Sequence, residues 1–425
     1  MFQSLIERPN SSINSSAGMS KLRVLAVALA GLCFTTACVN SGPAYEDSGL
    51  PAKRLSINDF SYVGAFAMPD KSFGASDSNY AEGIIEANGR SLFFVGHSHQ
   101  NAVAEFTIPP LVNSVSIADL NTAEPPRQPF TRLLDRVNGG NPENLDRIVG
   151  LELVNGRLIA NAMEYYDAPA DNKLTTFTVD NASSIGNSPV TGFYSMQGKV
   201  RAAGWLSSVP AEWQRALGCT HISGHSSGSP IISRHSVGPS AFCVNLGSVG
   251  SQPMRKGIRT KELLGFKLSK PLDKDLDNQF GGNTTWTNLS EARFGFIVPG
   301  TSTYMTIGSS GGHRSGVGYK LNRVGEEQCP GSCAEDPTDV YNYYWLWDMR
   351  DLLRVRNNRL PSSAVVPYES GVFNVPFQTA KHINPIGGGS YDPQTGLLYL
   401  SVRNANNTLG PYSNPPVIVA YRINR

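Results

Sequence analysis

Apolar and polar positions along the chain recur as strand–loop–strand units. The turn "NGR" at 88–90 precedes the apolar run "SLFFVG"; the polar loop "HSHQN" follows, and "AVAEFTI" returns. A second "NGR" at 155–157 opens "LIANAME", and "LTTFTV" returns after "YYDAPADNK". Asn-Gly between apolar runs favours a β-hairpin because both residues accept a positive φ. The pattern therefore predicts hairpins over these segments.

Three further segments follow a similar plan. "YMTIGSS", "GGHRSG" and "VGYKL" form one unit, and "LLYLSV" with "VIVAYRI" forms the last. "SPIISRHSVGPSAFCVNL" has the same form without the Asn-Gly turn. Helical patterns are restricted to "PAEWQRAL" (210–217) and "MRDLLRV" (349–355). The aromatic run at 341–349 reads as a core strand, with a sugar-stacking platform as the alternative.

Hairpins that repeat along a β-rich chain predict a β-propeller. From Leu55 to Arg425, blades of about 50 residues would give roughly seven blades. Because five units are visible, five long blades are the runner-up, and a pair of β-sandwiches is the third alternative. The strand at 60–69 is expected to complete the last blade beside 416–423, which would close the ring. We therefore predict one all-β domain over residues 55–425.

Composition agrees with a turn-rich globular chain. The 425 residues include 42 glycines and 28 prolines, and 16% of them are charged. The formal net charge of +2 gives no strong field, and no basic run interleaves with aromatic residues. Nucleic-acid binding is therefore not expected.

The N-terminus has the pattern of an export signal. "KLRVLAVALAGLCFTTAC" combines a basic start, an apolar run and small residues before Cys38, and Met19 could be the true start. Residues 1–38 are therefore predicted to be a signal peptide. The end of this segment resembles a lipobox, which predicts lipidation of Cys38, with ordinary cleavage as the alternative. Residues 39–54 are expected to be a flexible tether.

Four further cysteines follow the signal segment. An even number in an exported chain predicts two disulfides, Cys219–Cys243 and Cys329–Cys333. The alternative is a structural metal bound by Cys219, because His221 and His225 lie close to it in the sequence.

The polar loops of the repeated units carry the candidate chemistry. In a propeller, loops between second and third strands gather on one face, around the mouth of the central channel. These loops are rich in His, Tyr and Arg, which suit an anionic substrate: Arg holds a carboxylate, His removes a proton, and Tyr returns one. The candidate residues are His97, His99, Gln100, Tyr165, Tyr166, Arg234, His235, His313, Arg314 and Arg403.

This combination predicts β-elimination on a uronate-containing glycan. Glycoside hydrolysis would instead require two carboxylates across a cleft. Glu82, Glu105, Glu152 and Glu164 are available for that role, so hydrolysis remains an alternative.

Three segments carry a resemblance to known proteins. "GHSHQNAVAEFTIP", "SRHSVGPSAFCV" and "GGGSYDPQTGLLYLSV" resemble a group of exported bacterial β-propeller proteins without assigned activity. More remotely, the chain is similar to the ulvan lyase propellers, which cleave next to a uronate. That resemblance implies His97 as the base, Tyr165 or Tyr166 as the acid, and Arg234 as the neutralising residue. The loop "EYYD" departs from it, because a second histidine is usual there.

The leading hypothesis is an exported polysaccharide lyase that acts on an acidic, ulvan-like glycan. A non-catalytic, lipid-anchored propeller that binds a glycan or a protein is the alternative, and a glycoside hydrolase is the third. The lyase chemistry requires no cofactor. We expect a monomer that is periplasmic, anchored to the outer membrane or secreted, and that meets the membrane only through its lipid anchor.

Overall fold

The computed structural model describes residues 49–425, except 168, 170, 227–235, 252, 323–327 and 380–382. Residues Asp47–Arg425 form one compact unit. The signal peptide and the lipidation site Cys38 lie outside the described residues, so export and anchoring stay predictions. In the described part of the chain, no helix is long and apolar enough to cross a membrane.

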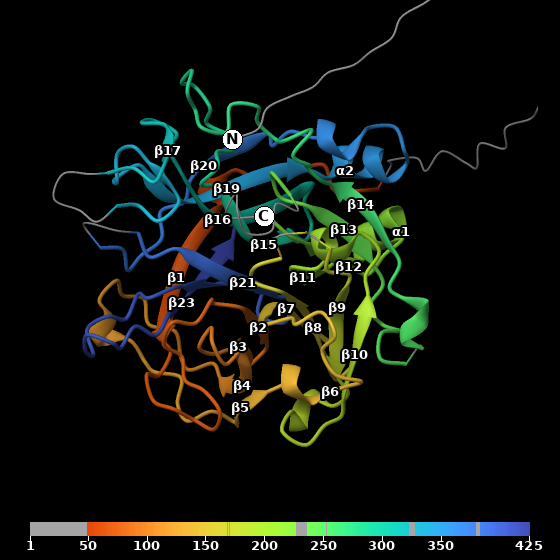
Figure 1. Ribbon diagram of the computed structural model, residues 1–425, viewed down its shortest axis with the longest axis vertical. Helices are drawn as coiled ribbons and strands as arrows, with labels where there is room; N and C mark the ends of the chain where they lie inside the picture. The colour runs from red at the N-terminus through yellow and green to blue at the C-terminus, as the bar shows by residue number, and fades with distance from the viewer. Residues whose placement is uncertain are drawn as a thin grey trace, which may run out of the picture. The chain divides into compact units, whose positions relative to one another are not determined.

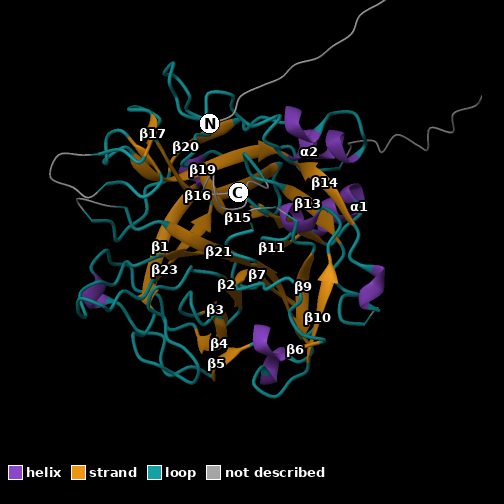
Figure 2. Ribbon diagram, in the orientation of Figure 1, coloured by secondary structure: helices purple, strands orange, loops and turns teal. Residues whose placement is uncertain are grey.

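The unit contains five antiparallel sheets of four main strands, which we call blades A to E (Figures 1 and 2). From the inside outwards, blade A contains β2 (Ile85–Asn88), β3 (Ser91–Val95), β4 (Ala102–Thr107) and β5 (Gln128–Arg132). In the same direction, blade B contains β7 (Arg147–Val154), β8 (Arg157–Met163), β9 (Leu174–Val179) and β10 (Val190–Ser195), with β6 (Val137–Asn138) parallel to β10. Blade C contains β11 (Trp205–Ser208), β12 (His221–Gly224), β13 (Ala241–Val244) and β14 (Thr260–Leu264).

Blades D and E complete the set. Blade D contains β15 (Glu291–Ile297), β16 (Thr303–Gly311), β19 (Val340–Asp348) and β20 (Glu369–Val372), and blade E contains β21 (Ile386–Asp392), β22 (Leu397–Val402), β23 (Val417–Ile423) and β1 (Phe60–Ala67). A separate hairpin joins β17 (Val317–Tyr319) to β18 (Ser332–Ala334). The α-helices among the described residues are α1 (Ala211–Leu217) and α2 (Met349–Arg356), at the two predicted positions.

The innermost strands contact one another in a ring. β2 contacts β7, β7 contacts β11, β11 contacts β15, β15 contacts β21, and β21 contacts β2. Figure 1 shows these five strands around the middle of the view, with β5, β10 and β14 at the periphery. The fold is therefore a five-bladed propeller. The prediction of seven blades is wrong, because long connections such as 108–127, 265–290 and 312–339 make each blade longer than the assumed repeat.

Both ends of the described chain contribute to blade E. β1 pairs antiparallel with β23, with Phe60 opposite Ile423 and Ala67 opposite Val417. This is the pairing that the sequence predicts for these two segments. The end of the predicted tether is also ordered against the blades: the Ser302 amide donates to the Lys53 carbonyl at 2.7 Å, and Leu50 packs on the core. Residues 50–54 therefore belong to the domain.

Two of the predicted hairpins have different strands from those expected. In blade C the first strand of the hairpin is β12, and the predicted first strand in "SPIISRHS" falls outside the described residues. In blade D the partner of β16 is β19, whereas "VGYKL" supplies the small hairpin β17–β18. The aromatic run at 341–349 is the buried strand β19, as predicted. β19 can pair along the whole of β16 because both strands have nine residues, whereas β17 has three.

Glycines make a narrow waist around the channel: Gly150 and Gly388 lie in β7 and β21, and Gly204 and Gly83 come just before β11 and β2. A Cβ on Gly150 would lie 2.0 Å from the Gly204 carbonyl oxygen, and one on Gly388 would lie 2.5 Å from the Gly83 oxygen. Backbones of neighbouring blades can approach this closely only where both lack a side chain. The waist divides the channel into an upper mouth, where the inner strands begin, and a lower end, where they finish.

Both predicted disulfides are present, Cys219–Cys243 and Cys329–Cys333. The alternative of a metal site at Cys219 is therefore wrong, because its sulfur is bonded to another sulfur. His221 instead contacts Thr220 Oγ1 through Nδ1 at 2.8 Å. The first disulfide joins the segment after α1 to β13, on the same side of blade C as the lower end of the channel.

Candidate functional site

The histidines of "GHSHQ" hold a turn together at the rim of blade A. The His97 amide donates to the Asp77 carbonyl at 2.9 Å, and the His99 amide donates to His97 Nδ1 at 3.1 Å. Gln100 Oε1 accepts from Ser76 Oγ at 3.4 Å. Burial lowers the pKa of His97. These contacts give His97 a structural role. They do not support the prediction that His97 acts as a base.

His313 and Arg314 lie after β16 in blade D, and both side chains bind other groups of the protein. His313 lies between Ser310 Oγ and the Asn283 carbonyl oxygen, each 2.7 Å from a ring nitrogen. The guanidinium of Arg314 pairs with Asp339 at 3.4 Å. Both ring nitrogens of His313 are therefore occupied by the protein.

The remaining predicted residues divide between the mouth and the undescribed segment. Arg403 lies at the upper mouth, where its Nη1 is 3.2 Å from Glu82. Tyr165 lies under the guanidinium of Arg147, 4.7 Å from it, and Tyr166 beside it is exposed. Arg234 and His235 lie outside the described residues. His225 is buried, and its amide donates to Ser240 Oγ at 2.9 Å. The structure thus brings Tyr165 and Arg403 to the same mouth, whereas His97 and His313 each bond within their own surroundings.

The upper mouth is a network of ion pairs. Glu82 Oε2 is 3.2 Å from Arg403 and 3.5 Å from Arg293, and Arg293 Nε is 3.0 Å from Glu291. Burial alone would raise the pKa of Glu82, but Arg293, Arg403 and Arg147 outweigh it and lower that pKa. Glu82 is therefore a carboxylate that stays ionised.

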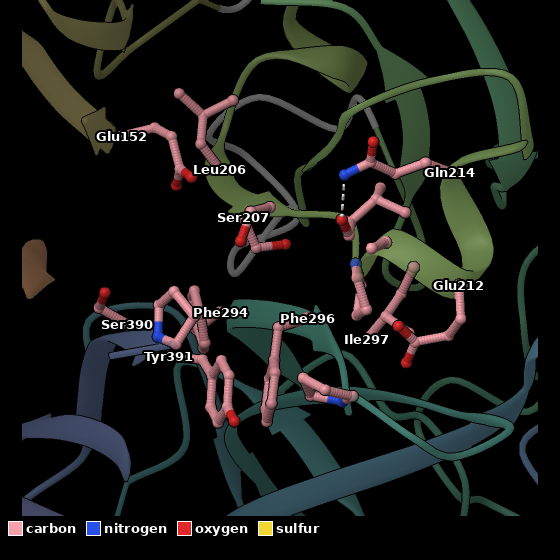
Figure 3. A pocket seen from close by; sticks show the side chains of 16 residues that line it. Glu152, Leu206, Ser207, Glu212, Gln214, Phe294, Phe296, Ile297, Ser390 and Tyr391 are labelled. Carbon is pink, nitrogen blue, oxygen red and sulfur yellow. Dashed lines mark hydrogen bonds between the residues drawn. The ribbon is translucent and has the colours of Figure 1, made fainter. Parts of the chain in front are cut away.

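The lower end of the channel opens into a cavity of about 350 Å³. Figure 3 shows Glu152 and Glu212 on opposite sides of this cavity, with Ser207 between them. Its walls come from blades B to E, together with α1 and the segment before it. The lining side chains that bear on its chemistry are Glu152, Ser207, Glu212, Phe296, Ser390 and Tyr391.

One wall of the cavity is a stack of aromatic rings. Phe294 and Phe296 are 5.7 Å apart with an interplanar angle of 19°, and Phe296 and Tyr391 are 5.3 Å apart at 13°. The pairs join β15 to β21, so the stack is fixed by two blades. Phe294 and Phe296 are almost completely buried, so Tyr391, which is partly exposed, is the ring that this wall offers to a ligand.

Two buried carboxyl groups lie at the inner end of the cavity. Glu152 faces the cavity, and burial followed by the nearby Glu86 raises its pKa well above the ordinary value. Glu86 is held close by: its carboxylate accepts from the Leu153 amide at 3.2 Å and from Ser390 Oγ at 2.9 Å. Because two adjacent buried carboxyls resist double ionisation, this pair retains a proton at neutral pH.

His221 adds no positive charge to this pair. Its Nε2 lies 3.7 Å from Glu152 Oε1, a separation at which charged groups would form an ion pair. Burial lowers the pKa of His221 to about 4, so the imidazole is neutral where Glu152 is protonated. Glu152 is therefore a neutral carboxylic acid that faces a cavity.

The opposite side of the cavity supplies a carboxylate and unused polar atoms. Glu212 is half-buried on α1 and accepts from the Gly300 amide at 2.6 Å. Ser207 Oγ is buried and has no hydrogen-bond partner among the described residues. An acid, a carboxylate and an aromatic wall thus surround one space.

The sequence contains a signal for the buried pair in its strands, outside the polar loops. Glu86 and Glu152 each stand two residues before the last residue of their strand, Asn88 and Val154, next to the Asn-Gly-Arg sequences of "EANGR" and "ELVNGR". These turns end the inner strands of consecutive blades. Equivalent positions before equivalent turns indicate neighbouring places around the channel. By contrast, Glu105 pairs with Arg127 at 2.9 Å in an outer part of blade A.

Comparisons with known proteins give solved structures of similar arrangement only. No family model and no curated protein matches the chain. It is similar to the α-L-arabinanase of Cellvibrio cellulosa, with 10% identity, a TM-score of 0.36, and coverage of 80% of this chain and 91% of that one. The α-L-arabinofuranosidase of Podospora anserina has 10% identity and a TM-score of 0.35, with coverage of 85% of this chain and 97% of that one. A DUF4623 family protein of Bacteroides eggerthii has 10% identity and a TM-score of 0.34, with coverage of 88% of this chain and 78% of that one.

The β-elimination hypothesis is wrong. The link to ulvan lyases finds no support among the solved structures just named. The geometry also goes against elimination. Arg403, at the mouth, contacts a glutamate of the protein itself, and His97 is engaged in its own turn.

Proposed function

We propose that the protein is a glycoside hydrolase whose active site is the lower cavity. The observation that carries the proposal is Glu152, a protonated carboxyl that faces a cavity with an aromatic wall. Glycosidases need one carboxylic acid with a raised pKa and one carboxylate. Tyr391 is the partly exposed ring that a sugar can contact, and the Ser207 hydroxyl group has no hydrogen-bond partner among the described residues.

The proposed roles follow from the two protonation states. Glu152 donates its proton to the glycosidic oxygen as the bond between that oxygen and the anomeric carbon breaks. A water molecule forms the new bond to this carbon and loses a proton to Glu212. Both steps keep atoms and charge balanced, and Glu86 lies behind Glu152 as the neighbour that disfavours its ionisation.

The test is an assay for new reducing ends on neutral polysaccharides, including arabinan, arabinoxylan and β-glucan. Glu152→Gln should lower kcat by about 100- to 10,000-fold, the usual contribution of a general acid. Glu105→Gln is the matched control, because Glu105 is equally buried (6% exposed, against 7% for Glu152) but lies away from the cavity. Loss of activity in both variants, or in neither, would contradict the assignment of Glu152.

The non-catalytic binding propeller is the second candidate. The unpartnered Ser207 hydroxyl and the aromatic wall serve binding as well as catalysis. Saturable binding of a glycan to the wild-type protein, with no new reducing ends from any polysaccharide, would favour it.

A further inference from the structure

The upper mouth gathers charged side chains from four blades. Blade A supplies Glu82, blade B supplies Arg147, blade D supplies Glu291 and Arg293, and blade E supplies Arg403. Their side chains are 17–26% exposed, so each reaches solvent at the mouth. The group lies beyond the glycine waist from the lower cavity and takes no part in the proposed hydrolysis.

The charges of this group cancel once Asp146, which lies beside Arg147, is added to it. Arg293 and Arg403 contact Glu82, Arg293 also contacts Glu291, and Arg147 lies 3.5 Å from Asp146. Three guanidinium groups thus face three carboxylates. An anionic ligand would meet the carboxylates as well as the guanidinium groups, whereas hydroxyl groups can donate to the first and accept from the second.

Arg403 keeps an unused donor in this network. It contacts Glu82 through Nη1 alone, and its buried Nε has no hydrogen-bond partner among the described residues. Ser401 Oγ, near the end of β22 and two residues before Arg403, also has none in the described part of the chain. A buried donor without a partner is costly, and a ligand that supplies an acceptor relieves the cost.

An aromatic surface borders these polar groups. Tyr165 and Tyr166 are 45% and 55% exposed. The Tyr165 ring is held in place by Arg147, whose guanidinium lies 4.7 Å from the ring centre. Exposed tyrosines beside paired donors and acceptors offer both an apolar face and hydrogen bonds to one ligand.

From these observations we infer that the upper mouth is a second binding site, for a neutral sugar residue of a glycan. Tyr165 supplies the stacking face, Arg403 the donor, and Glu82 the acceptor. The inference does not depend on hydrolysis in the lower cavity, because the waist at Gly150 and Gly388 separates the two sites.

The test is affinity electrophoresis through gels that each contain arabinan, arabinoxylan, β-glucan or polygalacturonate. All variants carry Glu152→Gln, so that the glycan stays intact. Tyr165→Ala should weaken retention by a neutral polysaccharide by about 3- to 10-fold, the worth of one aromatic contact. Tyr165→Phe should restore it. The matched control is Tyr319→Ala, because Tyr319 is 54% exposed and also lies under a cation, Lys320, at 5.4 Å.

Three outcomes would overturn the inference. Equal retention of Tyr165→Ala and its parent would show that Tyr165 contacts no glycan. Stronger retention on polygalacturonate than on every neutral polysaccharide would show that the ligand is anionic. Absence of retention on all four gels would remove the site. None of these results bears on whether the lower cavity hydrolyses a glycosidic bond, which the reducing-end assay decides separately.

Discussion

Glu82 and Glu86 lie four residues apart at the inner edge of blade A, yet the pKa values of their carboxyl groups are shifted in opposite directions. Burial acts on both. At the upper mouth, Arg293, Arg403 and Arg147 outweigh it, and the pKa of Glu82 falls. At the lower end, burial dominates over the bonds from Leu153 and Ser390, Asp392 adds to it, and the pKa of Glu86 rises to about 8.

The difference teaches that the neighbours of a buried carboxyl, more than its depth, decide whether it is a base or an acid. A carboxylate surrounded by guanidinium groups stays ionised and can accept hydrogen bonds. A carboxyl beside another carboxyl keeps its proton and can give it away. One channel therefore holds two different chemical environments on either side of a narrow waist.

The largest effect is expected when one glutamate at each end of the channel is replaced by glutamine. Glu82→Gln should lower the free energy of unfolding by about 3–5 kcal/mol at pH 8, because it leaves two guanidinium groups without their shared carboxylate. Glu86→Gln should leave stability equal or higher at that pH, because it removes a proton-binding group that burial penalises. Urea unfolding of both variants checks this, and equal losses would erase the contrast.

The pH dependence of stability sharpens the comparison. The folded-state pKa of Glu86 is about 8, above the value of 4.5 expected when unfolded. Its stabilising contribution is thus fully present below pH 4.5 and is lost as the pH rises through about 8. The melting temperature of the wild-type protein should fall over this interval, with a shallower fall in Glu86→Gln. The opposite slope would contradict a retained proton.

Glu82 should behave in the reverse manner. Because its pKa is lowered in the folded state, its contribution is present above the unfolded value and is lost as the pH falls through the folded value. The difference in melting temperature between wild type and Glu82→Gln should therefore shrink on acidification. A difference that stays constant down to low pH would contradict the ion-pair network.

The disulfide Cys219–Cys243 offers a way to disturb the lower end alone. This disulfide fixes the segment that follows α1, and α1 itself carries Glu212. The paired substitution Cys219→Ser with Cys243→Ser should cost about 2–4 kcal/mol of stability and weaken ligand binding in the cavity. The Cys329–Cys333 pair is the matched control, since it joins the region of the β17–β18 hairpin. Equal effects on cavity binding would contradict the local role of the first disulfide.

The waist gives the smallest expected effect. Gly150→Ala should lower stability by about 1–3 kcal/mol, because the new methyl group meets the Gly204 carbonyl oxygen and the blades must move apart. Gly156→Ala tests the strain of positive φ alone, because Gly156 has φ +77° and open space around its Cβ position. Thermal unfolding of both variants separates crowding from backbone strain.

Much of the fold was predictable because its signals are local. Asn-Gly turns mark hairpins, the two short helices follow from their patterns, and both disulfides follow from the even number of cysteines. The number of blades was not predictable from an assumed repeat length, because insertions such as 312–339 add a hairpin that lies outside the main sheet.

The candidate site was harder to predict because it depends on the closed ring. The polar loops at the upper rim led to the prediction of His97 and His313 as site residues, but both side chains form hydrogen bonds within their own loops or blades. Glu86 and Glu152 lie in apolar strands, where a single glutamate looks like an ordinary solvent-facing position. Only the arrangement of five inner strands shows that these positions are neighbours in adjacent blades around the channel.

The pairing of β1 with β23 has a consequence for the order of folding. Phe60 and Ile423 are partners, so blade E cannot be completed until the last strand has been synthesised. Until then β1 and β22 each lack a neighbour, and their open edges can pair with other chains. Contacts between residues this distant in the chain also slow folding. The pairing of β23 with β1 is therefore the step that removes these open edges.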